Sequence, residues 1–440
     1  MQPIRVLVVD DSAVLRRLVV MALTSADGVE VVGTAADGVE AVHEVLRLAP
    51  DLVVMDLEMP ELDGIGAVRV LRRRGCNVPV VMVSTPTDDG AQATMAALAA
   101  GAADFVPKPV RATSAAEALG MLRADLLPVV RALVPRSLPR APAAGAPAPS
   151  SSPDRTGPDA ASGGGAGAPE PGPAGDEGVA RGRATGHGGA HRSPVPPVPV
   201  PRSVPSRSAA PGPVLGPPPG AAPSAARPSP AALPGRGPGV APALVALGSS
   251  TGGPEALAAL VAALPAGLPV PVVVTQHMPP VFTRQLAARL DRLAALEVRE
   301  AEDGDPLVPG RLLVAPGDRH LEVRRDGAGL VATLTGAPPV HHCRPAVDVM
   351  LRSAASAVGS GVLAVVLTGM GSDGRDGCAD VRRAGGRVLV QDRATSVVWG
   401  MPGAVASAGL ADAVLPLADI APAVAAACRR PVLLAGRGAR

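Results

Sequence analysis

Residues 54–60 read Val-Met-Asp-Leu-Glu-Met-Pro, and Asp63-Gly64 follow shortly afterwards. The apolar run at 51–55 is typical of a buried β-strand, and it leads directly into the carboxylate of Asp56. Four more short apolar runs occur before residue 110, and amphipathic stretches separate them. Strands that alternate with helices predict a parallel, doubly wound α/β sheet, in which ligands bind at the carboxyl ends of the strands.

The N-terminal part of the chain is therefore expected to contain five strands and five helices. The strands are predicted at residues 4–9, 29–33, 51–55, 78–84 and 103–107. The helices are predicted near 13–25, 37–49, 63–74, 88–101 and 112–126.

Composition divides the 440-residue chain into two folded parts. Residues 141–240 contain 24 Pro and 19 Gly and no aromatic residue, and their only leucines are Leu215 and Leu233. Such a segment cannot bury enough apolar surface to offset the entropy of ordering, so we expect it to be disordered. We predict one domain over 1–130, a disordered linker over 131–241, a second domain over 242–432 and a flexible tail over 433–440.

The charge balance and the cysteines limit the class of protein. Basic and acidic residues nearly cancel, 41 against 39, which argues against a nucleic-acid-binding surface. A run of about 18 apolar residues, which a membrane span needs, does not occur, so we do not expect membrane insertion. The cysteines are far apart and form no Cys-x-x-Cys pair, which favours reduced thiols and a cytoplasmic location. They are Cys76, Cys343, Cys378 and Cys428.

Polar side chains gather where the N-terminal strands end. Asp10, Asp11 and Asp56 follow two of the strands, Ser84 ends the fourth, and Lys108 follows the fifth. Three carboxylates at one edge repel one another unless a cation such as Mg²⁺ lies between them. A hydroxyl and an ammonium would then hold a phosphoryl group on one carboxylate. Helix capping explains Asp11 or Ser84 alone, but not three acids beside the only lysine of the chain.

This half resembles the response-regulator receiver domain over residues 3–125. The resemblance implies a flavodoxin-like fold and phosphorylation by a histidine kinase, with Phe105 as the switch aromatic. It assigns Asp56 as the phospho-acceptor, Ser84 and Lys108 as phosphoryl-binding residues, and Asp10, Asp11, Asp56 and the backbone carbonyl of Glu58 as Mg²⁺ ligands.

The second half shows the same alternation of strands and helices. We predict strands at 243–247, 270–275, 311–315, 362–368 and 387–391, and helices near 254–263, 281–294, 346–358, 375–384 and 402–409. A hairpin insert over 319–334, turning at Asp326-Gly327, is expected to add antiparallel strands.

A glycine-rich turn at 248–254, Gly-Ser-Ser-Thr-Gly-Gly-Pro, follows the first of these strands. Such a turn suits either a phosphate-binding loop or an exposed serine nucleophile beside a helix N-terminus. The loop lacks a following Lys or Arg, and no candidate ribose-binding acid occurs about twenty residues on. These absences disfavour dinucleotide binding.

His277 follows the predicted strand at 270–275, and Asp373 lies in a second glycine-rich loop after the predicted strand at 362–368. Parallel strands bring their ends to one edge, so Ser250, His277 and Asp373 form a candidate triad. Ser250 would attack a carbonyl, His277 would transfer the proton, and Asp373 would orient the imidazole. Backbone N–H groups at Thr251 and Met370 would stabilise the oxyanion. Taken singly, each residue of the triad is also explained as a helix cap, an ordinary histidine or a turn residue.

The sequence His341-His342-Cys343 invites comparison with a zinc site. Adjacent residues of an extended chain point in opposite directions, and a second pair of ligands does not appear. We therefore expect no metal there, and no cofactor in the second domain.

This half resembles the catalytic domain of the CheB-type chemotaxis protein-glutamate methylesterases over about 243–430. Ser-Ser-Thr-Gly-Gly-Pro at 249–254, Gln-His-Met-Pro at 276–279 and Thr-Gly-Met-Gly-Ser-Asp-Gly at 368–374 carry the resemblance, together with 344–348 and 400–402. Ala346 stands where the family usually has serine. The resemblance implies a Rossmann-like fold, hydrolysis of glutamate methyl esters on chemoreceptors with release of methanol, and deamidation of receptor glutamines.

Two other functions remain open from the residues alone. The second half could be a non-catalytic output domain that binds a nucleotide or a protein, or a serine hydrolase with another ester substrate. The resemblance also implies that the unphosphorylated receiver restrains the hydrolase. A linker of about 100 residues would weaken that restraint, because effective concentration falls as a tether lengthens.

Overall fold

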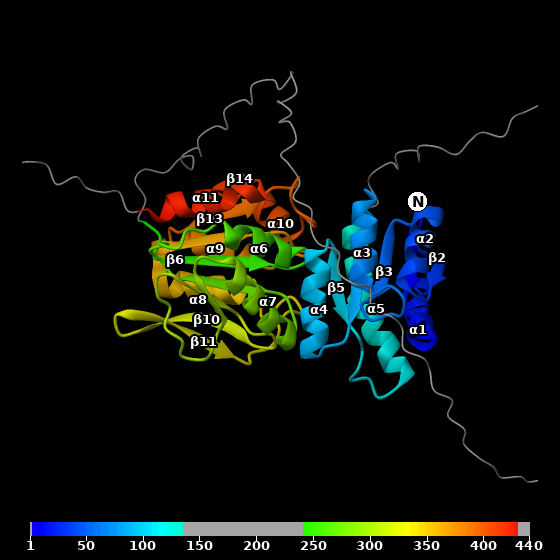
Figure 1. Cartoon of the computed structure of the whole chain (residues 1–440). Coiled ribbons are helices and arrows are strands. Elements are labelled where there is room, and N and C mark those ends of the chain that lie inside the picture. Colours follow the sequence, from blue (N-terminus) through cyan, green and yellow to red (C-terminus); the bar gives the residue numbers. More distant parts are fainter. Residues whose placement is uncertain (1, 135–240, 430–440) are drawn as a thin grey trace, which may run out of the picture. The chain divides into compact units, whose positions relative to one another are not determined.

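The computed structural model describes residues 2–134 and 241–429. The predicted linker and tail lie almost entirely outside these residues. Each half is an α/β domain built on a parallel sheet, as the sequence predicts (Figure 1).

The N-terminal domain has one five-stranded sheet in the order β2-β1-β3-β4-β5, and every paired strand is parallel to its neighbour. The strands are β1 (Ile4–Val9), β2 (Val29–Ala35), β3 (Leu52–Asp56), β4 (Val80–Ser84) and β5 (Asp104–Pro107). The helices are α1 (Ala13–Thr24), α2 (Gly38–Leu48), α3 (Gly64–Arg73), α4 (Asp88–Ala99) and α5 (Ala115–Leu133).

The two faces of this sheet are buried by different helices. Val6 and Val8 of β1 pack in one cluster with residues of α1 and α5, whereas Leu7 and Val9 pack with α2, α3 and α4. Alternate residues of a strand point to opposite faces, so an unbroken apolar strand is what a sheet covered on both sides requires. The carboxyl-end edge is left for polar side chains.

Helix α5 is longer than predicted, because it ends at Leu133 and not near residue 126. The prediction stopped ahead of Pro128, since proline lacks an N–H and disfavours a helix interior. Leu126, Leu127 and Val130 are nevertheless buried, so packing against the domain outweighs the lost hydrogen bond. Helix α5 therefore extends beyond residue 130, which is the predicted end of the first domain. The domain limits themselves remain predictions.

The C-terminal domain has a seven-stranded parallel sheet in the order β14-β13-β12-β6-β7-β9-β8. Its strands are β6 (Leu244–Ser249), β7 (Val272–Gln276), β8 (Glu297–Glu300), β9 (Arg311–Val314), β12 (Val362–Val366), β13 (Arg387–Gln391) and β14 (Ala413–Leu415). Its helices are α6 (Gly253–Ala262), α7 (Pro280–Leu293), α8 (Val347–Val358), α9 (Arg375–Arg383), α10 (Met401–Ser407) and α11 (Leu417–Cys428), with a short 3₁₀ turn η1 (Gly359–Gly361).

Three of these elements were not predicted, namely β8, β14 and α11. The edge strand β8 reads Glu-Val-Arg-Glu, and only Val298 of it is buried. Strand β14 has three residues, and α11 contains Pro422 in its interior. Short charged edge strands and a proline-containing helix carry little local signal, and pairing with the sheet decides their structure.

The predicted hairpin is present as β10 (His320–Asp326) and β11 (Gly329–Thr335), an antiparallel pair separate from the main sheet. Gly327 in its turn has φ +56°, a backbone conformation that glycine adopts without strain.

The two domains begin their helices differently. All five N-terminal helices have a Ser, Thr or Asp side chain that accepts a hydrogen bond from the first turn. In none of the six described C-terminal α-helices, α6 to α11, does the N-cap residue itself supply such a side-chain acceptor. Their first N–H groups therefore remain available for other acceptors. No described helix is both long enough and apolar enough to cross a bilayer.

Candidate active site

Three loops meet at the carboxyl-end edge of the C-terminal sheet. Ser250 lies in the turn between β6 and α6, His277 directly follows β7, and Asp373 lies in the loop between β12 and α9. Strand β6 pairs with β12 on one side and with β7 on the other. The three loops are therefore neighbours at one edge of the sheet, as expected for parallel strands.

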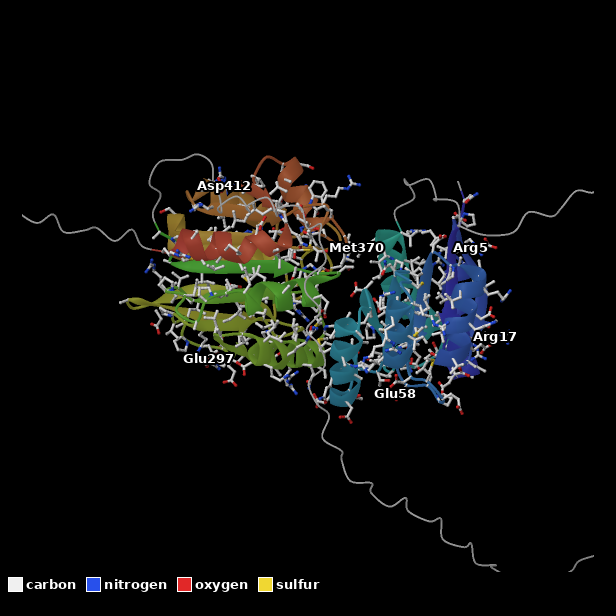
Figure 2. The ribbon with its side chains drawn as sticks, turned by 45° about the horizontal axis from the view of Figure 1, so that its top comes forward. Arg5, Arg17, Glu58, Glu297, Met370 and Asp412 are labelled. Atoms are coloured by element: carbon white, nitrogen blue, oxygen red, sulfur yellow. The ribbon has the colours of Figure 1, made fainter. Side chains whose placement is uncertain are left out.

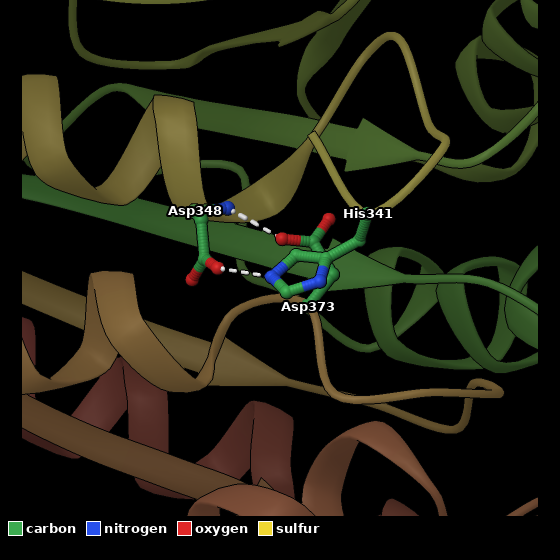
Figure 3. A group of neighbouring side chains, drawn as sticks. All are labelled: His341, Asp348 and Asp373. Carbon is green, nitrogen blue, oxygen red and sulfur yellow. Dashed lines mark hydrogen bonds and ion pairs between the residues drawn. The ribbon is translucent and has the colours of Figure 1, made fainter. Parts of the chain in front are cut away.

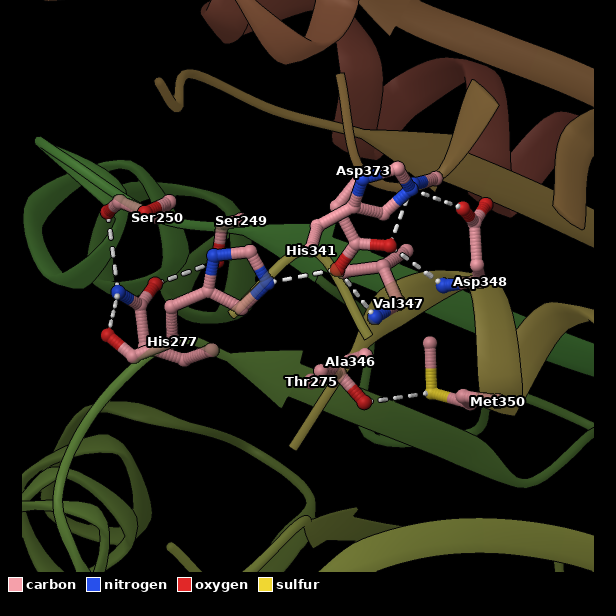
Figure 4. Close-up of polar contacts among 12 residues, drawn as sticks. Ser249, Ser250, Thr275, His277, His341, Ala346, Val347, Asp348, Met350 and Asp373 are labelled. Carbon is pink, nitrogen blue, oxygen red and sulfur yellow. Dashed lines mark hydrogen bonds and ion pairs between the residues drawn. The ribbon is translucent and has the colours of Figure 1, made fainter. Parts of the chain in front are cut away.

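His277 and Asp373 are directly bonded. The distance from His277 Nε2 to Asp373 Oδ2 is 2.7 Å, and Figure 4 shows the imidazole edge facing the carboxylate. A carboxylate oxygen only accepts, so Nε2 carries the proton of the neutral ring. Nδ1 is then the nitrogen that can accept a proton from a nucleophile.

Asp373 also binds the start of helix α8. Its carboxylate accepts hydrogen bonds from the backbone N–H groups of Val347 at 2.7 Å, Asp348 at 2.9 Å and Gly374 at 2.9 Å. Ala346 is the N-cap of α8 and has no side chain that could accept these bonds. Asp373 supplies the cap from a distant loop, which explains how the helix tolerates alanine at its N-cap.

These contacts set the charges of the pair. Burial alone would raise the pKa of Asp373, but the bond and the charge of His277, with the amides of α8, hold it below its usual range. Burial lowers the pKa of His277, but interactions with Asp373 and with Cys343 raise it to about 9. The carboxylate is thus kept ionised, and the imidazole is a stronger base than usual.

Ser250 is fixed by its backbone. Its N–H donates to the carbonyl of Thr368 at 3.1 Å, and its own carbonyl accepts from Gln276 Nε2 at 3.0 Å. Among the described residues, no hydrogen bond joins the Ser250 hydroxyl to His277. The structure therefore brings the three loops together, with the His277–Asp373 pair bonded and the serine hydroxyl not yet engaged.

Gln276 is a buried polar residue whose role the sequence analysis did not recognise. Its Oε1 accepts from Ser249 Oγ at 2.6 Å, while Nε2 holds the Ser250 carbonyl. Gly253 allows this approach, because a Cβ there would lie 2.0 Å from Gln276 Oε1. Gln276 thereby braces the serine turn. The sequence feature that could have indicated this role is the position of Gln276 directly before His277 in the Gln-His-Met-Pro motif.

The predicted oxyanion donors lie next to the serine. Met370 follows Gly369, whose Cβ, if present, would lie 3.0 Å from Ser250 Cβ. Within residues 2–134 and 241–429, the backbone N–H groups of Thr251 and Met370 have no hydrogen-bond acceptor. Amides that are free beside a serine can stabilise a negative oxygen. Figure 2 labels Met370 in its loop.

The N-terminal domain has a second polar site at the corresponding edge of its own sheet. Carboxylate oxygens of Asp10, Asp11 and Asp56 all lie within 4.8 Å of one another. Lys108 Nζ lies 2.7 Å from Asp56 Oδ1, and the backbone N–H of Leu57 donates to the same oxygen at 2.8 Å. The predicted convergence of three acids and the only lysine is therefore present.

This acid cluster has an excess of negative charge. Burial, followed by the charge of Asp56, raises the pKa of Asp10 to about 6. Burial also raises the pKa of Asp56, and Lys108 offsets only part of the effect. Oxygen ligands with uncompensated charge fit Mg²⁺.

Ser84 and Glu58 are the two remaining predicted residues of the phosphorylation site. Ser84 ends β4 beside Asp56, but its hydroxyl donates to the Gly90 carbonyl at 3.1 Å and accepts from Thr94 Oγ1 at 2.7 Å. It is not bonded to Asp56. Glu58 lies in the loop after β3, two residues beyond Asp56, and its side chain is exposed (Figure 2).

Comparison with known proteins identifies both domains. Residues 245–424 match the family model for CheB methylesterase, and residues 6–119 match that for the response regulator receiver domain. A protein-glutamate methylesterase/protein-glutamine glutaminase of Nocardioides sp. (strain ATCC BAA-499 / JS614) is 45% identical over 425 residues, which cover 96% of this chain and 95% of the relative. The chain belongs to the protein-glutamate methylesterase/protein-glutamine glutaminase family.

Another relative and two solved structures are also similar to this chain. A protein of the same name from Maricaulis maris (strain MCS10) is 41% identical over 429 residues, covering 96% of this chain and 94% of the relative. The Thermotoga maritima CheB methylesterase catalytic domain is 44% identical, with a TM-score of 0.42, and covers 42% of this chain and 99% of that chain. The response regulator domain of Thermotoga maritima CheB is 42% identical, with a TM-score of 0.25, and covers 28% of this chain and 96% of that chain.

Family membership favours the methylesterase reading over a non-catalytic output domain. The chain combines a receiver domain with a methylesterase domain, as the sequence motifs predicted. The roles of the individual site residues remain predictions.

Proposed function

We propose that this chain hydrolyses glutamate γ-methyl esters on chemoreceptors, releasing methanol, and deamidates receptor glutamines to glutamate. The names of its full-length relatives support this substrate class. The single observation that carries the chemistry is the 2.7 Å bond between His277 and a buried, ionised Asp373, in a loop beside the Ser250 turn. That bond holds the imidazole of His277 at the edge of the sheet where Ser250 is the predicted nucleophile.

In the proposed reaction, Ser250 Oγ attacks the ester carbonyl while His277 Nδ1 takes the hydroxyl proton. The backbone N–H groups of Thr251 and Met370 donate to the oxyanion that forms. When the C–O bond to the methoxy group breaks, His277 returns the proton and methanol leaves. Water then attacks the glutamyl-serine ester by the same steps, which frees the glutamate and restores Ser250.

Deamidation follows the same route. The carbonyl is that of a glutamine side chain, and the group that leaves the tetrahedral intermediate takes the proton from His277 to depart as ammonia. Ester and amide converge on one glutamyl-serine intermediate, so both reactions are expected to fail together when Ser250 is replaced.

The receiver domain is proposed to control this activity. A histidine kinase of the chemotaxis type transfers a phosphoryl group to Asp56, and Lys108 and Ser84 hold it. Asp10, Asp11, Asp56 and the Glu58 carbonyl would hold Mg²⁺, which would neutralise negative charge at this site. Phosphorylation raises hydrolase activity. The reaction is placed in the cytoplasm, in keeping with four unpaired cysteines, Cys76, Cys343, Cys378 and Cys428.

The test compares two adjacent serines. Ser249 Oγ is buried and bonded to Gln276, so it cannot attack a substrate. Methanol release from methylated chemoreceptor is measured for the wild type, Ser250→Ala and Ser249→Ala, with Mg²⁺ and a small phosphodonor. We expect Ser250→Ala to lower the rate by at least about 10⁴-fold, and Ser249→Ala to lower it by about tenfold through the loosened brace.

Hydrogen exchange over residues 241–429 of Ser250→Ala, compared with the wild type, tests whether the substituted domain is folded. Equal methanol release by Ser250→Ala and the wild type would exclude Ser250 as the nucleophile. A wild type that releases no methanol in the phosphorylated state would exclude the proposed substrate.

A further inference from the structure

A group of three possible metal ligands lies beside the catalytic pair. It comprises His341, Asp348 and Asp373, and Figure 3 shows the imidazole of His341 facing the two carboxylates. One ligand atom from each side chain lies within 4.8 Å of the other two. The residues come from three segments: the turn at 340–343, the first turn of α8, and the loop between β12 and α9.

A strained turn holds His341 in this position. Val340 and Cys343 exchange backbone hydrogen bonds of 3.0 and 2.9 Å, so residues 340–343 form a tight hairpin turn. The two central residues, His341 and His342, have φ values of +51° and +63°. A turn with two positive φ values normally contains Asn-Gly, and histidine adopts this conformation only when the surroundings require it.

The two carboxylates of the group are almost fully buried. Asp348 and Asp373 each expose 1% of their surface, and burial, together with the charge of Asp373, raises the pKa of Asp348. Asp348 Oδ1 accepts from the Gly377 N–H at 2.6 Å, and its Oδ2 lies 3.0 Å from His341 Nε2. His341 is the least buried member, with 38% of its side chain exposed, so an ion can reach the group from its side.

We propose that His341, Asp348 and Asp373 bind Zn²⁺, and that bound Zn²⁺ inhibits the hydrolase. One imidazole nitrogen and two carboxylate oxygens are donors that suit Zn²⁺, with water completing the coordination. The ion relieves the repulsion between two buried carboxylates. An imidazole ligand favours Zn²⁺ over Mg²⁺, which prefers oxygen donors alone.

Inhibition follows from the shared aspartate. Asp373 Oδ2 accepts the proton of His277 Nε2, and a zinc ion on this carboxylate competes for the same charge. The orientation of His277 and its strength as a base are then both lost. Zinc binding does not depend on the proposed function, whereas its inhibitory consequence does.

This site differs from the one considered in the sequence. The three adjacent residues 341–343 were not expected to bind a metal as a set, because neighbouring side chains diverge. In the structure only His341 joins the group, and its partners follow it by 7 and by 32 residues in the chain. That spacing carries no recognisable zinc motif.

The experiment uses the full chain, saturated with Mg²⁺ so that the receiver acids are occupied. Zn²⁺ is titrated into the wild type, His341→Asn and His342→Asn, and metal binding is followed by calorimetry alongside ester hydrolysis. Asparagine tolerates a positive φ, so both variants can keep the turn. His342 is the matched control, because it shares the turn and the backbone conformation but is not in the group of ligands.

We expect Zn²⁺ to bind and inhibit the wild type and His342→Asn alike, each relative to its own rate with Mg²⁺ and without Zn²⁺. His341→Asn should need at least about tenfold more Zn²⁺ for both effects. Equal zinc affinity in His341→Asn and the wild type would overturn the site. Zinc binding that depends on His341 without inhibition would overturn the inhibitory role and leave the binding site standing.

Discussion

The receiver and the methylesterase domain both have carboxylates at the carboxyl-end edge of a parallel sheet. The surroundings shift the pKa of these carboxylates in opposite directions in the two domains. In the receiver, Asp10, Asp11 and Asp56 face one another with a single lysine, and the pKa of Asp10 rises to about 6. In the methylesterase domain, three backbone amides and His277 surround Asp373, and its pKa falls.

The difference in carboxylate pKa indicates which chemistry each site supports. An acid cluster with too little positive charge is ready for a cation and for a phosphoryl group bound through it. A carboxylate surrounded by hydrogen-bond donors can stay ionised while its histidine partner gains and loses a proton. Aspartate is therefore the predicted Mg²⁺ ligand in the receiver, and in the proposed hydrolysis it orients the histidine of the other domain.

The largest effect is expected from Asp373→Asn in the methylesterase domain. The amide cannot keep His277 in the same tautomer, so kcat/KM should fall by about 10⁴-fold. The side chain also loses acceptors for the first turn of α8, so the free energy of unfolding should fall by about 1–3 kcal/mol. Ester hydrolysis and urea denaturation measure the two losses.

Asp376→Asn is the control for that substitution, because Asp376 lies three residues further on and pairs with Arg375 at the surface. It should change the free energy of unfolding by less than about 0.5 kcal/mol. A stable Asp373→Asn variant with full activity would remove the proposed contrast between the two domains.

The pH dependence of hydrolysis should show the next largest effect. His277 must be neutral to act as a base, and its pKa of about 9 means that kcat/KM should rise by roughly 50-fold between pH 7 and pH 9. Protonated His277 stabilises the fold below about pH 6.5, and this contribution is lost as the pH rises through 9. Activity should therefore increase where stability decreases.

Cys343→Ala sharpens this prediction. The interaction with Cys343 helps to raise the pKa of His277, so its removal should move the rise in kcat/KM toward lower pH. A pH profile identical to that of the wild type would show that the thiol does not act on His277.

Shortening the linker should change the coupling between the two sites by a smaller amount. A tether of about ten residues in place of about 100 raises effective concentration roughly thirty-fold, or about 2 kcal/mol. Restraint by the unphosphorylated receiver should strengthen, so methanol release without phosphodonor should fall by at most about thirty-fold. Release in the presence of phosphodonor serves as the internal reference, and an unaltered ratio would contradict the expected restraint.

The smallest effect concerns Asp10→Asn in the receiver, and its sign is opposite to that of Asp373→Asn. The folded-state pKa of Asp10 is raised, so its ionisation lowers stability as the pH rises from about 4 to 6. Without Mg²⁺, Asp10→Asn should increase the free energy of unfolding by on the order of 1–2 kcal/mol at pH 7. Hydrogen exchange over residues 2–134 measures this gain, which Mg²⁺ should abolish. A destabilised variant without Mg²⁺ would show that the acid cluster is already compensated.

Much of the fold was predictable because its strands are apolar and end on polar motifs. Strand β1 was predicted at residues 4–9, its bounds in the structure, and the three triad loops were assigned to one sheet edge. Edge strand β8 and helix α11 were not predictable, since their structure depends on pairing and packing with distant segments. The brace from Gln276 and the cap from Asp373 are likewise contacts across the fold, which residue types alone do not specify.

The cap that Asp373 places on α8 has a consequence for inheritance. Ala346 gives the helix no acceptor of its own, so a gene copy freed from selection for catalysis would still be selected to keep this aspartate for folding. Ser250 carries no comparable structural duty through its hydroxyl. A descendant protein that has lost hydrolase activity would therefore have a substitution at Ser250 but retain Asp373.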